Sequence, residues 1–254
     1  MSSNVSKRMY PIIEIERIKN PRQFYAFPVV GGIVKAVMLI PQYLMLFFAG
    51  LCFGIAMLIN PFVVLFTGKY WKPAYDWAIK YINIQVKITF FSRGLTDKYP
   101  GFTYDIEDNF SVTVNYPNNP NKLFAIPFLG FLARAVVMIP FGIYSQVLLS
   151  ASNVMSIFSS PAVLFKKYYP ESTYELARDA VRTDAASSLY FAGISDTMPT
   201  YKISKNHLAL KLLFIVLGAI LFIFNSSNDV DRFQKEKVSP SVAPSKPTNF
   251  ETIR

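Results

Sequence analysis

Two long uncharged runs constrain this chain more than any other feature of its sequence. Residues 36–66 and 135–165 each form a run of 31 residues without a charged side chain. As a helix, either run would be roughly 46 Å long, against a hydrocarbon core of about 30 Å in a membrane. Soluble domains disperse their apolar residues by period instead of collecting them in such blocks. The sequence therefore predicts a membrane protein.

The composition narrows the class of activity. Charged residues make up only 17% of the chain, and the net charge is +10. One cysteine, Cys52, cannot form an internal disulfide, and one histidine, His207, leaves little for zinc or histidine chemistry. The sequence has no phosphate loop, no nucleophile elbow and no suitably spaced carboxylate pair. We therefore expect a protein that is not an enzyme and that uses no metal, no cofactor and no nucleic acid.

Each run is too long for one comfortable span and too short for two, unless it begins earlier, near Phe24 and Leu123. Small residues occupy the middle of both runs, where a hairpin would turn: Ala49, Gly50 and Gly54 in the first, and Ser150, Ala151, Ser152 and Asn153 in the second. This pattern favours two helical hairpins. The alternative is an interfacial helix that ends at Pro41 or Pro140, followed by a single span.

Charge placement favours the hairpins. Residues 1–26 carry five Lys/Arg against two Glu, and residues 68–101 carry six against two Asp. The positive-inside rule assigns both segments to the cytoplasm, and a hairpin keeps them together there. Residues 207–224 are predicted to form a last transmembrane helix, with Lys211 reaching the interface. We expect a multi-pass protein of a prokaryotic plasma membrane with a cytoplasmic N-terminus.

The chain repeats itself at an offset of 99 residues. Residues 20–41 and 119–140 share nine identities in 22 positions, and Lys35 aligns with Arg134. The same offset aligns further residues on both sides of the uncharged runs, among them Tyr70 with Tyr169, Gly94 with Gly193, and Asp97 with Asp196. Two copies of one unit are therefore predicted, and hairpins would make the copies run parallel.

Each unit is predicted to contain two strands and an amphipathic helix around its hairpin. Alternating patterns predict strands at 13–16, 102–104, 112–115 and 201–203, and helices at 73–91 and 171–191, the first of them interfacial. The predicted fold is an α-helical polytopic membrane protein of two tandem strand–helical hairpin–amphipathic helix–strand units, a C-terminal transmembrane helix and a small cytoplasmic β element. Its predicted parts are a tail (1–9), unit 1 (10–106), unit 2 (110–204), the last helix (207–224) and a disordered tail (225–254).

Three motifs resemble one known family. They are Ile40-Pro41 after a basic residue in an apolar helix, residues 65–70 (LFTGKY) and residues 95–102 (LTDKYPGF). Together they resemble the prokaryotic membrane-protein family called domain of unknown function 4389. The resemblance covers about residues 10–104, and residues 110–203 more loosely, because residues 166–170 (KKYYP) replace the Thr-Gly step. It implies a polytopic membrane protein without an established activity.

Lys35 and Arg134 are the leading candidate site residues, because a cation inside an apolar helix needs a partner, a polar cavity or a route to the headgroups. They could bind an anionic lipid or solute, or simply reach nearby phosphates. Asp97 and Asp196, each three residues before a proline, could be their partners or could bond the backbone of a turn. The basic and aromatic residues Lys69, Tyr70, Lys72 and Trp77 are expected at the membrane interface.

These features favour an integral membrane protein whose basic cytoplasmic face organises anionic lipid headgroups or a partner protein, possible partners including a second copy of the chain. The motive is the basic cluster beside the first apolar run: Lys69, Lys72, Lys80, Lys87, Arg93 and Lys98. The alternative is a small transporter or channel component that uses Lys35 and Arg134.

Overall fold

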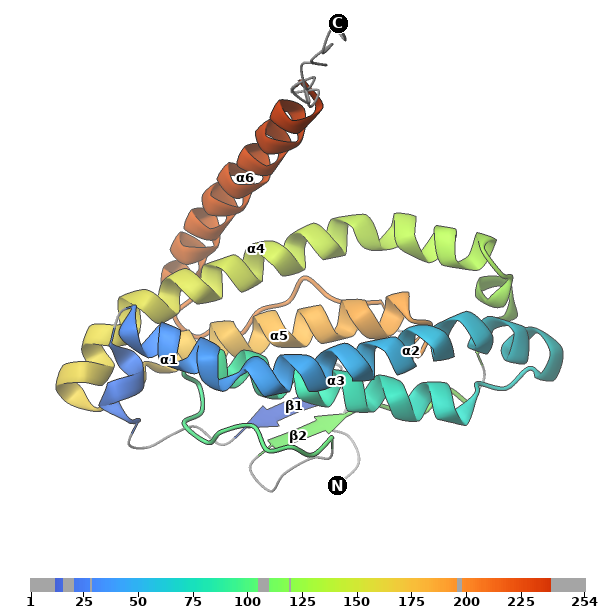
Figure 1. Cartoon of the computed structure of the whole chain (residues 1–254), viewed down its shortest axis with the longest axis horizontal. Coiled ribbons are helices and arrows are strands. Elements are labelled where there is room, and N and C mark those ends of the chain that lie inside the picture. The colour runs from blue at the N-terminus through green and yellow to red at the C-terminus, as the bar shows by residue number, and fades with distance from the viewer. Residues whose placement is uncertain are drawn as a thin grey trace, which may run out of the picture.

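The computed structural model describes residues 12–15, 21–27, 29–104, 110–118, 120–195 and 198–238. This part of the chain is mostly helical, with one small sheet (Figure 1). In chain order its elements are β1 (Ile12–Ile15), η2 (Gln23–Ala26), α1 (Val30–Met38), α2 (Ile40–Thr67), α3 (Lys72–Ser92), β2 (Phe110–Thr113), η3 (Lys122–Ala125), α4 (Leu129–Lys166), α5 (Glu171–Phe191) and α6 (Leu208–Val238), of which η2 and η3 are single turns of 3-10 helix.

Three helices of the described chain are long and apolar enough to cross a membrane. They are α2, α4 and the first part of α6, Leu208–Ser227. This agrees with the membrane class that the uncharged runs predict. Large apolar side chains cover the outer faces of α2 and α4, whereas small ones line the faces that pack inward, as Ala49 and Ala56 do in α2.

The predicted helical hairpins are wrong. α2 runs unbroken through Ala49 and Gly50, and α4 runs unbroken through residues 150–153. The small residues allow close helix contacts instead of turns. A Cβ placed on Gly50 would lie 3.4 Å from the ring of Tyr81 in α3, and Ala151 is fully buried against α6.

Of the four predicted strands, the described chain contains the pair formed by β1 and β2. They lie antiparallel, with Ile13 opposite Val112. Residues 102–104 and 201–203 form no strand, because helix side chains bind their backbone carbonyls. Asn83 donates to the carbonyl of Tyr104 (3.3 Å), and the Tyr144 hydroxyl donates to that of Tyr201 (3.0 Å). These contacts take the place of a ladder of backbone hydrogen bonds.

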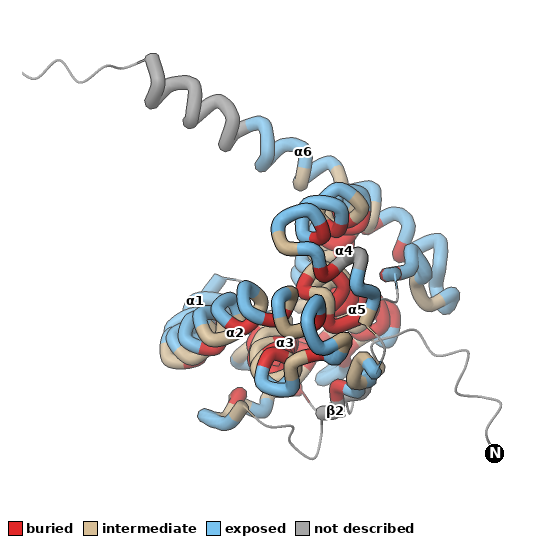
Figure 2. The backbone as a smooth tube through the Cα atoms, turned by 90° about the vertical axis from the view of Figure 1, so that its right-hand side faces the viewer, coloured by how far each residue is buried: buried red, intermediate tan, exposed pale blue. Residues whose placement is uncertain are grey.

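The two helices predicted at 73–91 and 171–191 are present as α3 and α5. α3 packs against α2, α5 packs against α4, and α3 and α5 meet in the middle of the molecule. Of 21 residues in each helix, 10 are buried in α3 and 14 in α5 (Figure 2). Alanines such as Ala78 and Ala177, each fully buried, line their shared core and allow close approach.

Lys211 does not reach the membrane interface. Its side chain is fully buried at the start of α6, and its Nζ donates to Glu175 of α5 over 2.6 Å and to the carbonyl of Ser204 over 3.1 Å. Asn206 also donates to Glu175. Burial alone would raise the pKa of Glu175, but these hydrogen bonds and the Lys211 charge outweigh it and hold the pKa below its usual value. The ion pair therefore fixes α6 to α5.

Backbone features recur at a spacing of 99 residues. Positive φ angles occur at Val29 and Phe128, before α1 and α4, and at Gly68 and Lys167, after α2 and α4. Gly94 and Gly193, after α3 and α5, have φ angles of 72° and 71°. Because few non-glycine residues adopt positive φ, this matched set indicates that both halves follow the same path.

The two halves contact each other reciprocally. The Tyr70 hydroxyl donates to the carbonyl of Ala192, and the Tyr169 hydroxyl, 99 positions later, donates to the carbonyl of Arg93. The side chains of Gln85 and Asp184, also 99 apart, bond each other. Such contacts define an approximate two-fold axis, which passes between Ile13 and Val112 and between α3 and α5.

Across this axis α2 and α4 run in opposite directions (Figure 1). The hairpins, on which the expectation of parallel copies rested, are absent. Hairpins would have returned the chain to the same end of the molecule, whereas each unbroken helix carries it to the other end.

α6 crosses α4 closely and then leaves the molecule (Figure 1). A Cβ on Gly218 would lie 2.5 Å from the backbone nitrogen of Ala151, so the crossing requires glycine at this position. The helix continues to Val238, past residue 224, where a disordered tail was predicted to begin. Good helix formers at 234–237 (QKEK) explain the extension. Residues 239–254 lie outside the described chain, as does the predicted tail at 1–9.

Replacing Gly218 by alanine should therefore destabilise the packing of α6 on α4. The new methyl group overlaps the α4 backbone, and relieving such an overlap costs about 1–3 kcal/mol. The matched control is Gly142→Ala in α4, where a Cβ meets nothing within 4 Å, and which should be neutral or stabilising by up to about 1 kcal/mol. Thermal unfolding in detergent measures both, and equal midpoints for the two variants would contradict the crossing.

Candidate functional site

Two cavities lie beside the buried cations Lys35 and Arg134. Both side chains are almost fully buried, with 6% and 5% exposed. The Arg134 cavity has a volume of about 60 Å³ and the Lys35 cavity about 50 Å³. At about 30 Å³ for each water molecule in the liquid, either holds one or two waters or a group of similar size.

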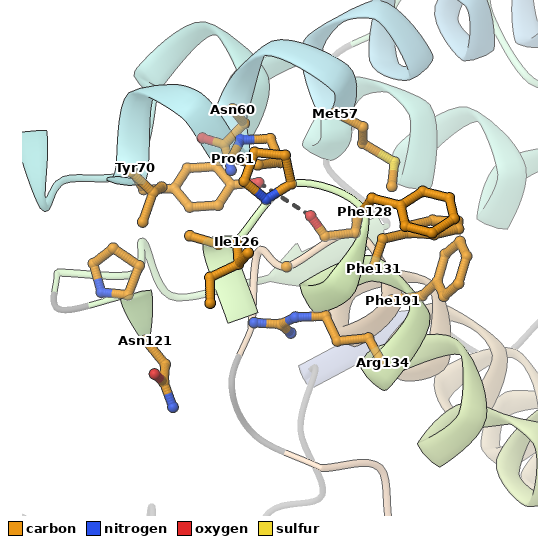
Figure 3. Close-up of a pocket in the computed structure, with 16 residues that line it drawn as sticks. Met57, Asn60, Pro61, Tyr70, Asn121, Ile126, Phe128, Phe131, Arg134 and Phe191 are labelled. Carbon is orange, nitrogen blue, oxygen red and sulfur yellow. Dashed lines mark hydrogen bonds between the residues drawn. The ribbon is translucent and has the colours of Figure 1, made fainter. Parts of the chain in front are cut away.

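Arg134 reaches from the first part of α4 to the C-terminal end of α5 (Figure 3). Its Nη1 donates to the carbonyl of Tyr190 over 2.7 Å and to that of Ser195 over 3.5 Å. The guanidinium also lies 5.0 Å from the centre of the Tyr190 ring. A cation at this end of a helix satisfies carbonyls that have no partner within the helix and complements the helix dipole. Arg134 therefore joins α4 to α5.

Lys35 lies in the equivalent place at the end of α3. Its Nζ is 5.6 Å from the centre of the Tyr25 ring, and a Cβ on Gly94 would come within 3.0 Å of it. Burial lowers the pKa of Lys35, while the charge of Asp97 acts in the opposite direction. Burial likewise raises the pKa of Asp97, against the hydrogen bond from Arg22 and the charge of Lys35. Each residue thus favours the charged form of the other.

Each cavity is built by both halves of the chain. Residues 99 apart take equivalent places in the two walls: Pro21 and Pro120, Arg22 and Asn121, Ala26 and Ala125, Lys35 and Arg134, Gly94 and Gly193, Met57 and Ser156, Pro61 and Ser160, Val64 and Val163, Tyr70 and Tyr169. In the Arg134 cavity the wall from α2 contains Met57 and Pro61 together with one polar residue, Asn60 (Figure 3). In the Lys35 cavity the α4 wall carries two hydroxyls, and Arg93 adds a second cation, so this cavity is the more polar one.

Asp97 joins its turn to the segment before α1. Its Oδ2 accepts a hydrogen bond of 2.5 Å from the backbone nitrogen of Arg22, 75 positions earlier in the chain. The structure thus brings Asp97 together with Lys35, as one of the two sequence interpretations expected, and also gives it a backbone partner. Asp196 lies outside the described residues.

The four residues predicted at the interface occupy different places. Lys69 and Lys72 are exposed, and Lys72 pairs with Asp76 over 3.2 Å. Trp77 is partly exposed, with the Nζ of Lys80 at 4.7 Å from its ring. Tyr70 is only 3% exposed and belongs to the central core. Tyr70 therefore serves the packing of the two halves and not the membrane interface.

Sequence reasoning missed the residues that come from the opposite half. Ser156, Ser160 and Tyr169 complete the Lys35 cavity although they lie far from Lys35 in the chain. The offset of 99 could have indicated that the two cavities are equivalent. It carries no information on which half supplies the second wall. Within the described chain, no group of His, Cys, Asp or Glu has a geometry that could hold a metal ion.

Comparisons with known protein families, with curated proteins and with solved structures find no match to this chain.

Replacing Arg134 by methionine should destabilise the fold, because it leaves the carbonyls of Tyr190 and Ser195 buried without this donor. The Tyr190 carbonyl keeps a hydrogen bond from the backbone nitrogen of Gly193, so we expect a total loss of about 1–3 kcal/mol. Arg134→Lys is the matched control, since lysine occupies the equivalent position 35, and it should retain most of the stability. Denaturant unfolding in detergent micelles compares the three proteins. Equal stability of Arg134→Met and Arg134→Lys would contradict the helix-end role.

Proposed function

We propose that this chain is a non-enzymatic membrane protein that lies within one leaflet and organises anionic lipid around its basic ends. In this arrangement α1, α2 and α4 lie parallel to the membrane plane, and α6 crosses the bilayer. The observation that carries the proposal is the position of the sheet, which packs beside the middle of the central helices and not beyond their ends.

An apolar layer formed by the outer faces of α1, α2 and α4 supports contact with lipid along the whole length of these helices. Its exposed residues include Val30, Ile33 and Val37 of α1, Leu44, Phe47, Phe48, Leu51, Ile55, Leu58 and Phe62 of α2, and Leu129, Leu132, Val136, Ile139, Ile143, Ile157 and Phe158 of α4. Soluble monomers rarely expose apolar patches beyond a few hundred Å². This layer extends over two helices of 28 and 38 residues.

The sheet argues against α2 and α4 as upright spans. Figure 1 shows both strands beneath the central part of the molecule, and Ile13 and Val112 belong to the core cluster that α3 and α5 form. Because α2 packs along α3 and α4 along α5, upright helices would bring the strands to the centre of the bilayer. Exposed strand edges do not occur in hydrocarbon, because their backbone groups have no partners there. Helices that lie in the plane keep the sheet in water.

α6 supports the same orientation. It leaves α4 steeply, on the side of the molecule opposite to β2 (Figures 1 and 2). Helices that cross so steeply cannot both stand upright in one bilayer. If α6 crosses the membrane, α4 lies close to its plane, and the sheet faces the aqueous side from which α6 enters.

Anionic lipid is the ligand that the charge distribution favours. Among residues 21–27, 29–104, 120–195 and 198–227, the exposed carboxylates are Asp76 and Glu171, whereas the exposed cations are Arg22, Lys69, Lys72, Lys98, Lys122, Lys166, Lys167, Lys202 and Lys205. Lys69 follows α2, and Lys166 and Lys167 end α4, so both ends of the apolar layer carry positive charge. Each such cation near an anionic surface contributes about 1 kcal/mol of attraction.

The two halves are proposed to be tandem copies of one unit, and the family with domain of unknown function 4389 remains the proposed relative. Support comes from the recurrence of backbone angles and contacts at 99 residues and from the motifs around Pro41, Thr67 and Asp97. A prokaryotic plasma membrane is the location that this family resemblance implies.

A small transporter or channel component is the second proposal. The observation in its favour is the opposite direction of α2 and α4, since many transporters are built from inverted repeats with an axis in the membrane plane. In that arrangement α2 and α4 cross the bilayer in opposite directions, and the cavities beside Lys35 and Arg134 lie within it. The two proposals predict different sides for the ends of α2 and α4.

Cysteine labelling separates these orientations. In a Cys52→Ala background, Lys69→Cys and Lys166→Cys place single thiols at the ends of α2 and α4, and Ser227→Cys places one far along α6. We expect a membrane-impermeant maleimide to label the first two from the same side and Ser227→Cys from the other, because only α6 crosses. Labelling of Lys69→Cys and Lys166→Cys from opposite sides would contradict the in-plane orientation and favour the transporter.

Neutralising the basic ends should weaken the preference for anionic lipid. For Lys69→Gln/Lys166→Gln/Lys167→Gln, the selectivity for spin-labelled phosphatidylglycerol over phosphatidylcholine next to the protein should fall several-fold in reconstituted bilayers. For the unchanged protein, about 1 M salt should have a similar effect, because the Debye length falls to about 3 Å. Selectivity that survives both changes would count against an electrostatic role for these lysines.

A further inference from the structure

A third cavity, larger than the two beside Lys35 and Arg134, lies next to the approximate two-fold axis. We call it the axial cavity. Its volume is about 270 Å³, and it is lined by Gln85, Val86, Thr89 and Arg93 of α3, Gln146 and Leu149 of α4, and Val181, Asp184 and Ala185 of α5. Gln146 is exposed within the uncharged run of α4, so the cavity meets the apolar layer.

The polar groups of the axial cavity are only partly satisfied. Asp184 accepts hydrogen bonds from Gln85 (2.8 Å) and Ser145 (2.9 Å), and the Nε of Arg93 donates to Asn153 (2.9 Å). Two buried atoms among the described residues that line it have no hydrogen-bond partner: Nη1 of Arg93, a donor, and Oε1 of Gln85, an acceptor. Leaving such groups unsatisfied is costly, and native proteins rarely do so without a reason.

Arg93 remains a cation in this position. Burial lowers its pKa to about 10, with the charges of Asp184 and Tyr169 acting in the opposite direction. It is therefore protonated at neutral pH, and it offers a charged donor beside an acceptor and a carboxylate.

The other half of the molecule serves as an internal control. At the equivalent positions 99 residues away, Arg93 is replaced by Ala192, Gln146 by Phe47 and Asn153 by Gly54. The same backbone path is thus compatible with small or apolar residues at these places. Arg93, Gln146 and Asn153 thus have no polar counterparts across the axis, so the fold itself does not require them.

We infer that the axial cavity binds a phosphate ester that also carries a hydroxyl or ammonium group, as a phospholipid headgroup does. The ester oxygens accept hydrogen bonds from Arg93, which matches phosphate geometry through its planar fork. The hydroxyl or ammonium donates to Gln85 Oε1 and lies near Asp184. The cavity is too small for acyl chains, which would extend past Gln146 along the apolar layer. This inference goes beyond the proposed orientation and does not depend on it.

Titration of the purified full chain in maltoside micelles tests the inference. The probes are dihexanoyl-phosphatidylethanolamine, as the lipid source, and phosphoethanolamine, as the free ester, with binding followed by phosphorus NMR. The variant Arg93→Ala/Gln146→Phe carries the residues found 99 positions away and should bind at least about tenfold more weakly. Lys205→Ala removes one charge outside the cavity and should bind as the unchanged protein does.

The outcomes are distinct. Binding of the lipid that the double variant loses supports a headgroup site, and equal binding of phosphoethanolamine supports a soluble ester as the ligand. If neither probe binds, or if the double variant binds both as tightly as the unchanged protein, the cavity holds water only and the inference is overturned. Circular dichroism and the thermal midpoint show whether the double variant is folded, and Gln146→Phe alone replaces it if it is not. A micelle does not have two sides, so these measurements do not depend on how α2 and α4 lie in a membrane. The labelling experiment tests that orientation separately.

Discussion

The contact of α3 with α5 about the two-fold axis is the interaction on which the rest of the structure depends. Small side chains such as Ala78 and Ala177 allow the two helices to approach, and the Gln85–Asp184 hydrogen bond joins their midpoints. The Tyr70 hydroxyl bonds the backbone just after α5, and the Tyr169 hydroxyl bonds the backbone just after α3, so each half is joined to the other. Because α3 and α5 fill the interior, α2 and α4 are left on the outside with their large apolar side chains exposed. This packing leaves an apolar surface larger than soluble monomers usually expose.

The two buried cations show how an apolar helix can carry charge without direct exposure. Arg134 binds carbonyls at the end of α5, and Lys35 lies beside Gly94 at the end of α3, near Asp97. Helix ends present carbonyls that need donors, so a cation there replaces much of the hydration that it loses. The equivalence of the two positions does not extend to the cavity walls, because the wall from the opposite half carries Met57 and Pro61 beside Arg134 and the hydroxyls of Ser156 and Ser160 beside Lys35. Positions at which the two halves differ in polarity therefore indicate residues with a role beyond stabilising the fold.

The sequence predicted which segments form helices and strands better than it predicted how these elements pack. The strong periodicity of residues 73–91 and 171–191 and the alternation at 13–16 predicted real elements, because local patterns determine helices and strands. The hairpins failed because small residues such as Gly50 and Ala151 suit a tight turn and a close helix crossing equally well. The offset of 99 indicated that Lys35 and Arg134 are equivalent, but a linear repeat has no direction in space. It therefore could not predict that the halves pack about a two-fold axis, or that Ser156 and Tyr169 complete the cavity of Lys35.

The central claim is that the long apolar helices lie in the plane of the membrane. Polarised infrared spectroscopy of the full chain in aligned bilayers tests it directly, because amide I dichroism reports the mean tilt of helix axes. With α1 to α5 in the plane and α6 upright, the account predicts a mean helix orientation close to the membrane plane. A mean orientation close to the membrane normal would contradict it.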